Sequence, residues 1–301
     1  MSRILLLVAL LVVGCTPLPY GIGGPPPTPT TVLDARNATV ATAEAGRDVG
    51  QNAAAYYDRG NLYLLRGQDA AAIADYDESL ALDTTNARAF NNRGLAHAAL
   101  GRIDEALADY AAAISSDRQY VRAYRNRLVL LEERGDLVAI AADYAVLAEI
   151  DPERAADSRY REGVAYVGLR DVDAALRAFN TALELDPQHV DAYYERGLLL
   201  FATDRLTEAI EDFDLALALS PRAANGYYAR GLAFQVRGDY ERARADFSMA
   251  LSLTPDDAAA LIGRAIAARA LGDESQATAD LARARELPLD PALRRIIESL
   301  E

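Results

Sequence analysis

The sequence predicts an all-α protein in which about seven short helix pairs stack one after another into a solenoid. Glycine or another small or apolar residue recurs at a period of 34 from Gly60 onward. Around each of these positions, apolar residues follow helical spacing in two segments that a short turn separates. The apolar fraction of 51% with 25% charged residues is typical of a folded chain. Because one helix pair cannot bury its apolar face alone, the repeats must pack on one another.

The N-terminus has the layout of a secretory leader. Met1–Arg3 is a short charged start, and the apolar run Ile4–Val13 is too short to span a bilayer comfortably as a retained helix. The tetrapeptide Val12-Val13-Gly14-Cys15 resembles the lipobox of bacterial lipoproteins, in which cleavage occurs before a lipidated cysteine. The resemblance implies a lipoprotein signal peptide over residues 1–14 and an acyl anchor on Cys15, the single cysteine of the chain. The alternative is a retained anchor with an incidental cysteine.

Residues 15–52 are expected to form a tether behind this cysteine. The stretch from Thr16 to Thr31 is rich in proline and glycine, which disfavour both helix and sheet. Val32–Gln51 has only a weak helical pattern and is expected to be a loose N-terminal cap. Thr16 follows the cysteine in place of an acidic residue, and the resemblance to sorted lipoproteins therefore implies the outer membrane, facing the periplasm.

Seven repeat units fit residues 53–289, with one inserted residue near Ala155. Three positions define them. The recurring residues at the first position are Gly60, Gly94, Leu128, Gly163, Gly197, Gly231 and Ala265. Twelve residues later stand Ala72, Ala106, Ile140, Ala175, Ala209, Ala243 and Ala277, and four further on Tyr76, Tyr110, Tyr144, Phe179, Phe213, Phe247 and Leu281. Leu128 and Ile140 are large where the other units are small, so the helices of the third pair should pack further apart or cross differently.

This pattern resembles the tetratricopeptide repeat, whose aromatic, glycine, alanine and proline positions recur at fixed offsets within 34 residues. The resemblance implies a right-handed α-solenoid. Proline closes four units, at Pro152, Pro187, Pro221 and Pro255. The chain departs from the family in one respect, because arginine replaces the usual leucine before the glycine.

Each of these arginines has an aspartate sixteen residues later. The pairs are Arg59 and Asp75, Arg93 and Asp109, Arg127 and Asp143, Arg196 and Asp212, Arg230 and Asp246, and Arg264 and Asp280. Unit four has neither member and carries Glu162 and Ala178 instead. We interpret the pairs as structural ion pairs across each helix pair, worth up to about 1 kcal/mol each if exposed.

Residues 290–301 are expected to form a C-terminal capping helix. Asp290-Pro291 is a typical helix start, and Leu293, Ile296, Ile297 and Leu300 make one apolar stripe. The helix would cover the last exposed face of the array. The alternative is a docking helix for a partner.

The chain offers few groups for catalysis. It contains no lysine, its two histidines stand far apart, and no Ser-His-Asp or metal-spaced cluster occurs. The net charge of −14 argues against nucleic-acid binding. We therefore expect no enzymatic activity, no cofactor and no metal. His97 is expected to be a partly buried packing residue, and His189 a solvated turn residue.

In the tetratricopeptide family, the first helix of each pair lines the inner wall of the superhelix. Carried onto this chain, that pattern predicts a groove with a basic and amide-rich half and an aromatic half. The first half comprises Tyr57, Asn61, Arg88, Asn91, Asn92, Arg122, Arg125 and Asn126. The second comprises Tyr160, Val164, Tyr194, Leu198, Phe201, Tyr228 and Leu232.

Asn61, Asn92 and Arg122 also coincide with three positions of the carboxylate clamp of chaperone-binding family members. The other two clamp positions hold Tyr57 and Asn126, so the match is partial, and Arg125 could supply the missing charge. Extended peptides with an acidic or free C-terminal end would suit such a wall. The alternative is that these side chains merely solvate a concave face.

Together these resemblances imply a membrane-anchored interaction scaffold of the bacterial envelope. In organisation it is similar to the NlpI-type lipoproteins with tetratricopeptide repeats. The expected partners are envelope proteins or peptides and, through the acyl anchor, the lipid bilayer. Two alternatives stay open: a periplasmic peptide-binding chaperone, and a self-associating structural component, that is, a homo-oligomer.

Overall fold

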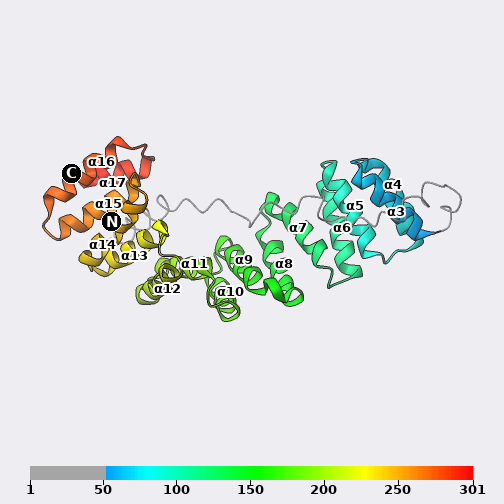
Figure 1. The fold of residues 1–301 in the computed structure, drawn as a ribbon, viewed down its shortest axis with the longest axis horizontal. Coiled ribbons are helices and arrows are strands. Elements are labelled where there is room, and N and C mark those ends of the chain that lie inside the picture. Colours follow the sequence, from blue (N-terminus) through cyan, green and yellow to red (C-terminus); the bar gives the residue numbers. More distant parts are fainter. Residues whose placement is uncertain (1–51, 301) are drawn as a thin grey trace. The chain divides into compact units, whose positions relative to one another are not determined.

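A computed structural model of the chain describes residues 52–300 and contains, over that range, fifteen α-helices and no strand (Figure 1). The predicted signal peptide, Cys15 and the tether up to residue 51 lie outside the described residues. The helices are α3 (Ala53–Leu65), α4 (Asp69–Leu82), α5 (Ala87–Ala99), α6 (Ile103–Ser116), α7 (Val121–Arg134), α8 (Leu137–Ile150), α9 (Ala155–Gly168), α10 (Val172–Leu185), α11 (Val190–Ala202), α12 (Leu206–Leu219), α13 (Ala224–Arg237), α14 (Tyr240–Leu253), α15 (Ala258–Ala270), α16 (Glu274–Glu286) and α17 (Pro291–Ser299).

The helices from α3 to α16 form seven consecutive pairs, which confirms the predicted all-α repeat architecture. We call the first helix of each pair A and the second B. The inserted residue falls at a short 3₁₀ turn, Pro152–Arg154, just before α9. By internal packing, the described chain divides into an N-terminal unit, residues 52–158, and a C-terminal unit, residues 159–300.

A left-handed residue joins helix A to helix B in all seven pairs. Five of these residues are glycines, for example Gly238 with φ of 87°. The equivalent residues of the fourth and fifth pairs are Arg170 and Asp204, with φ of 60° and 63°. The turn geometry is therefore kept where glycine is absent, at some backbone strain.

The recurring glycines of helix A touch the aromatic ring of helix B. A Cβ atom added to Gly231 would lie 2.9 Å from a ring atom of Phe247, which is closer than real contacts allow. In the third pair Leu128 stands at this position and is buried together with Ile140. As expected, α7 and α8 approach each other along less of their length than the other two pairs of the N-terminal unit.

The six predicted Arg–Asp pairs all form, and each is bidentate. Arginine Nε and Nη2 donate to the two carboxylate oxygens over 2.5–2.9 Å. The prediction allowed for exposed pairs, but all six aspartates are buried, at 3–6% exposure. In five of them the guanidinium also lies 5.5–5.7 Å from the centre of an aromatic ring one turn earlier on helix A. Each pair thus fixes the register of helix A on helix B.

In four of these arginines the remaining nitrogen, Nη1, links the repeat to the one before it. Its partner stands sixteen residues earlier on the preceding helix B. The contacts are Arg93 with Asp77 at 2.6 Å, Arg196 with Asn180 at 2.5 Å, Arg230 with Asp214 at 2.6 Å and Arg264 with Ser248 at 3.4 Å. The equivalent residue for Arg127 is Ala111, which has no polar side chain, so α6 and α7 lack this link.

The substitution Ala111→Asp should supply the missing link between α6 and α7. Because Asp77 is half exposed in its contact with Arg93, the gain should be about 0.5–1 kcal/mol, or a rise of about 1–4 °C in the unfolding temperature. The matched control is Ala112→Asp, which adds the same charge one position away. Thermal unfolding followed by circular dichroism measures the difference, and equal melting temperatures for the two variants would contradict the prediction.

Candidate partner-binding surface

Within each unit, successive A helices approach one another more closely than successive B helices do. A stack of this kind curves toward its A helices, and we call the A-helix face away from the B helices the inner wall. Most of the groove residues predicted from the sequence belong to α3, α5 and α7 of the N-terminal unit and to α11 and α13 of the C-terminal unit.

Arg88 and Arg122 are exposed on the inner wall of the N-terminal unit, at the same position of α5 and α7. Neither guanidinium forms an ion pair with a carboxylate of residues 52–300. Both guanidinium groups interact electrostatically with Tyr120, and Arg122 also forms a hydrogen bond with its hydroxyl. Tyr57 lies close to Tyr120. Burial raises the pKa of Tyr120, and the two arginines oppose that rise. Sequence reasoning missed Tyr120, because it stands in the turn before α7.

The amides of this wall are bonded to one another. Asn92 Nδ2 and the Tyr76 hydroxyl both donate to Asn61 Oδ1, each over 2.8 Å. Asn91 Nδ2 donates to Asn92 Oδ1 over 3.1 Å, and Asn126 Nδ2 donates to Asn91 Oδ1 over 2.8 Å. This ladder joins α3, α4, α5 and α7.

The prediction that Asn91 and Asn92 face the groove is therefore wrong. Asn91 is fully buried and Asn92 is 9% exposed, because neighbouring A helices approach closely enough for their amides to pair. Arg125 does not supply a free charge either, since its guanidinium bonds the Asp151 carboxylate. Of the predicted clamp residues, Arg122 alone keeps an exposed side chain that the ladder does not use.

Most of the predicted aromatic half is core. Tyr194, Phe201, Tyr228 and Leu232 are buried, at 8%, 6%, 2% and 0% exposure. The rings of Tyr194 and Tyr228 pack 6.1 and 5.9 Å from Phe213 and Phe247 of their own pairs. Because they are buried, these four side chains cannot contact a partner in this structure. The sequence prediction placed them on the groove because helical spacing does not show which neighbouring side chains cover a wall.

Tyr160, Val164 and Leu198 keep part of their surface exposed. The ring of Tyr160 lies 4.8 Å from that of His189. His189 is not a freely solvated turn residue, since its Nδ1 accepts a hydrogen bond from the Ala192 amide over 3.2 Å and so caps α11. His97 is partly buried as predicted, with Nε2 3.9 Å from Asp109 Oδ2.

Glu195 is a titratable group that sequence reasoning did not single out. It follows Tyr194 on α11 and is half-buried. Burial raises the pKa of its carboxyl to about 7, with a smaller contribution from the charge of Asp191. No sequence pattern predicts this pKa shift, because it depends on how deeply the packed helices bury the carboxyl group.

The described residues contain no group of three or more His, Cys, Asp or Glu side chains placed to hold a metal ion. Among the helices of residues 52–300, none is both long and apolar enough to cross a bilayer.

Comparison with family models identifies repeats in four stretches. Tetratricopeptide repeats match residues 87–120, 160–224 and 224–257, and a TPR repeat matches residues 60–101. A comparison with curated proteins gave no match.

Solved structures of tetratricopeptide proteins share the fold. The C-terminal part of a TPR repeat-containing protein from Cytophaga hutchinsonii aligns with a TM-score of 0.62 at 17% identity, over 81% of this chain and 99% of that one. YrrB, described as a TPR protein with an unusual peptide-binding site, aligns with a TM-score of 0.52 at 21% identity, over 62% and 95%. A MamA double mutant of strain RS-1 aligns with a TM-score of 0.53 at 22% identity, over 58% and 94%.

The raised pKa of Glu195 makes stability depend on pH. Between the ordinary carboxyl pKa of 4.5 and about 7, the folded chain holds a proton that the unfolded chain releases, so stability falls as pH rises through this range. Glu195→Gln should change stability little at pH 4.5 and raise it by about 1–2 kcal/mol at pH 8. Denaturant unfolding at both pH values measures this, with the exposed Glu211→Gln as control. A gain that is the same at both pH values would refute the assignment.

Proposed function

Because the chain carries an array of tetratricopeptide repeats, we propose that it is a protein-interaction scaffold that binds partners on its inner wall around Arg88 and Arg122. The observation that carries this proposal is the state of these two guanidinium groups. The six arginines of the Arg–Asp pairs bond buried carboxylates, whereas these two stand exposed at the same position of α5 and α7, act together on Tyr120 and have no carboxylate partner among residues 52–300.

The partner that fits this surface is an extended segment with acidic side chains or a free C-terminal carboxylate. Guanidinium groups bind carboxylates through charge-assisted, often bidentate hydrogen bonds. Tyr57 and Tyr120 beside them offer ring surface for apolar side chains. YrrB, which shares the fold, is described as having a peptide-binding site, and that description is in keeping with a peptide ligand here.

We further propose that the scaffold is a lipoprotein of the bacterial envelope, anchored through Cys15. The lipobox-like Val12-Val13-Gly14-Cys15 and the proline-rich stretch behind it support this part of the proposal. Two or three acyl chains would hold the protein stably at a bilayer, whereas a single chain binds only marginally. In this organisation the protein would be similar to the NlpI-type lipoproteins. A periplasmic chaperone and a self-associating component are the alternatives.

Arg122→Glu should weaken binding of an acidic peptide with a free C-terminus by about tenfold or more, because it replaces a charge-assisted hydrogen bond by repulsion. Fluorescence anisotropy with a labelled peptide measures the affinity. The matched control is Arg102→Glu, which makes the same charge change at an exposed residue of the turn before α6. Equal affinity for the two variants would remove Arg122 from the proposed site.

The anchor has its own test. Metabolic labelling with palmitate should mark the wild-type protein, and Cys15→Ser should abolish the label and release the protein from membranes. A wild-type protein that carries no label would refute the lipoprotein proposal and would leave the proposed binding surface unaffected.

A further inference from the structure

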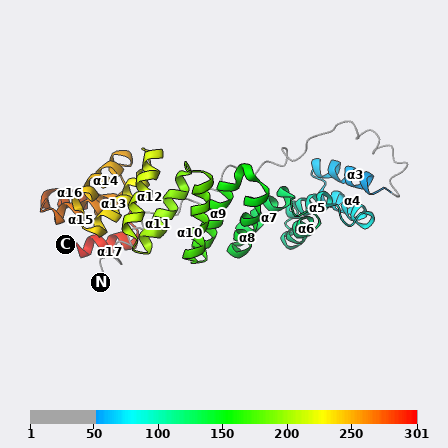
Figure 2. The same cartoon turned by 90° about the horizontal axis from the view of Figure 1, so that it is seen from below.

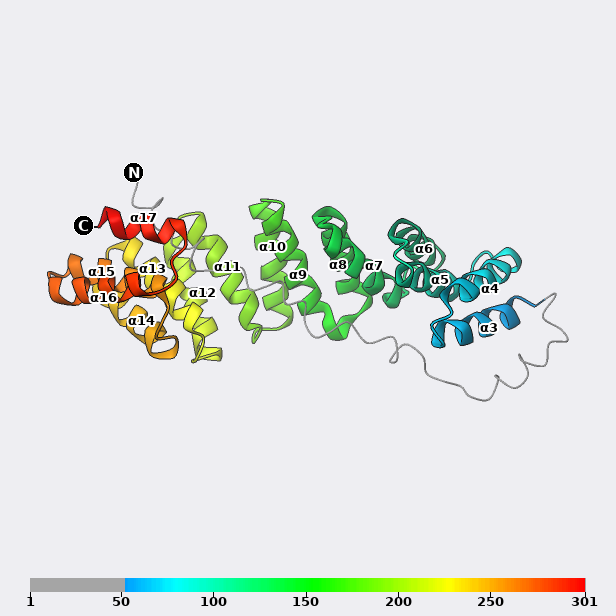
Figure 3. The ribbon, with the colours of Figure 1, turned by 90° about the horizontal axis from the view of Figure 1, so that it is seen from above.

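The terminal helix α17 does not continue the stack as an eighth A helix would. Figures 2 and 3 show it lying across α13 and α15, on the side away from α14. Leu293, Ile296 and Ile297 belong to the same core cluster as Tyr228 and Leu232 of the inner wall. Lying across α13 and α15, α17 covers part of the inner wall of the C-terminal unit, and α15 is the A helix that it contacts most.

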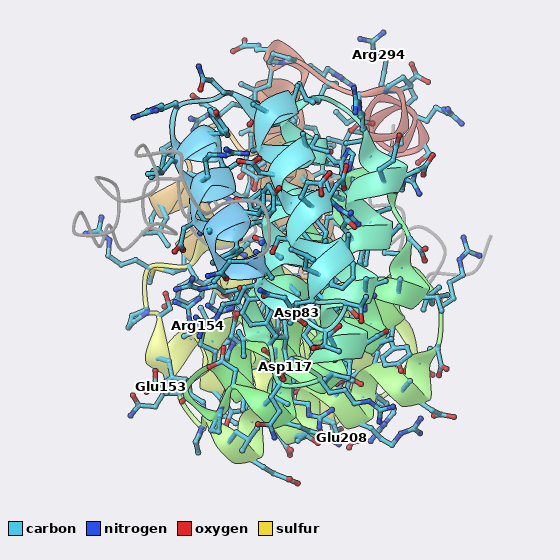
Figure 4. The ribbon with its side chains drawn as sticks, turned by 90° about the vertical axis from the view of Figure 1, so that its right-hand side faces the viewer. Asp83, Asp117, Glu153, Arg154, Glu208 and Arg294 are labelled. Atoms are coloured by element: carbon cyan, nitrogen blue, oxygen red, sulfur yellow. The ribbon has the colours of Figure 1, made fainter. Side chains whose placement is uncertain are left out.

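α17 has two different faces. Leu293, Ile296 and Ile297 are 5%, 5% and 2% exposed. Arg294 and Arg295 face solvent, and Figure 4 shows Arg294 pointing away from the body of the molecule. Amphipathic helical peptides bind hydrophobic grooves through an apolar stripe with this spacing.

The attachment of α17 is simple. An extended stretch from Leu287 to Asp290 leads into it, and Asp290 caps the helix itself by accepting from Ala292 and Leu293 amides over 2.7 and 3.0 Å. Arg269 of α15 donates to the carbonyl of Leu300. A nine-residue helix is not stable alone in water, so α17 depends on the wall for its structure.

The covered wall also holds an unsatisfied group. Gln235 lies on α13 three residues beyond Leu232 and is 4% exposed, and its Oε1 has no hydrogen-bond partner in the described chain. A buried polar atom without a hydrogen-bond partner is rare in folded proteins.

We propose that α17 is a built-in ligand of the α13–α15 wall, and that an amphipathic helix of a partner protein with the same apolar spacing replaces it. This inference rests on the proposed function in one respect, since it takes the inner wall as the binding surface. It adds a second mode of recognition. The N-terminal unit offers open arginines to an acidic segment, whereas the C-terminal unit offers an apolar wall to a helix once α17 has left.

The test uses a fluorescent peptide of residues 287–301 as the probe and the full chain as its receptor. Leu293→Asp with Ile297→Asp places charges on the buried stripe and should release α17 from the wall. The peptide should bind this double variant at least tenfold more tightly than it binds the wild type, because the tethered helix competes at high effective concentration. The same peptide carrying Ile297→Asp should bind neither receptor.

The matched control receptor is Arg294→Asp, which changes charge on the exposed face of α17 and should bind the peptide as weakly as the wild type does. Equal binding to the wild type and the double variant would overturn the proposal. Failure of the double variant to bind, with cooperative melting retained, would overturn it too. Loss of cooperative melting in the double variant would show that α17 is an integral part of the core.

Light scattering separates the proposed occupant from a second copy of the chain. A monomeric wild type supports a partner helix as the occupant, whereas a wild-type dimer that forms by exchange of α17 contradicts it. Arg122→Glu should leave peptide binding to the double variant unchanged. The binding of an acidic peptide around Arg122 and the exchange of α17 can therefore fail independently of each other.

Discussion

In six of the seven repeats, one guanidinium group ties helix A to helix B. Arg230 shows the full set: Nε and Nη2 bond Asp246 of its own pair, Nη1 bonds Asp214 of the preceding pair, and the ring of Tyr227 lies 5.6 Å away. Burial raises the pKa of Asp246 even though the guanidinium opposes that rise. Removing Arg230 would leave the buried Asp246 carboxylate unpaired, at a cost of about 3–5 kcal/mol. The main effect of the pair is therefore to fix the register of helix A on helix B, since a shifted helix would lose the bidentate hydrogen bonds.

The third and fourth repeats differ from the others in the contacts of this arginine. Ala111 leaves Arg127 without its link to the preceding helix, and Leu128 holds α7 away from α8. In the fourth repeat Glu162 replaces the arginine and bonds Arg159 one turn away on the same helix, over 2.8 Å. A local pair of this kind cannot tie helix A to helix B. The third repeat therefore lacks the arginine link to its predecessor, and the fourth lacks the Arg–Asp pair between its helices.

The two units use the same wall in different ways. In the N-terminal unit a ladder of amides fills the space between A helices and leaves Arg88 and Arg122 exposed above it. In the C-terminal unit the wall is aromatic and aliphatic, and α17 lies over part of it. The two proposed sites, one polar and one apolar, would recognise two kinds of segment. The apolar site would stay closed until a helix that competes with α17 binds.

The sequence by itself determined the repeat period, the helix pairs, the Arg–Asp partners and the cap at Asp290, because each depends on spacing within one or two neighbouring helices. Tertiary structure alone decided which wall residues can meet a partner. Asn91 and Tyr228 stand at positions that line a groove in the family, yet both are buried. Their exposure depends on how closely adjacent A helices pack and on where α17 lies, and no periodic pattern encodes either. The raised pKa of Glu195 has the same origin, since the dielectric around a carboxyl is a property of the packed neighbours rather than of the residue.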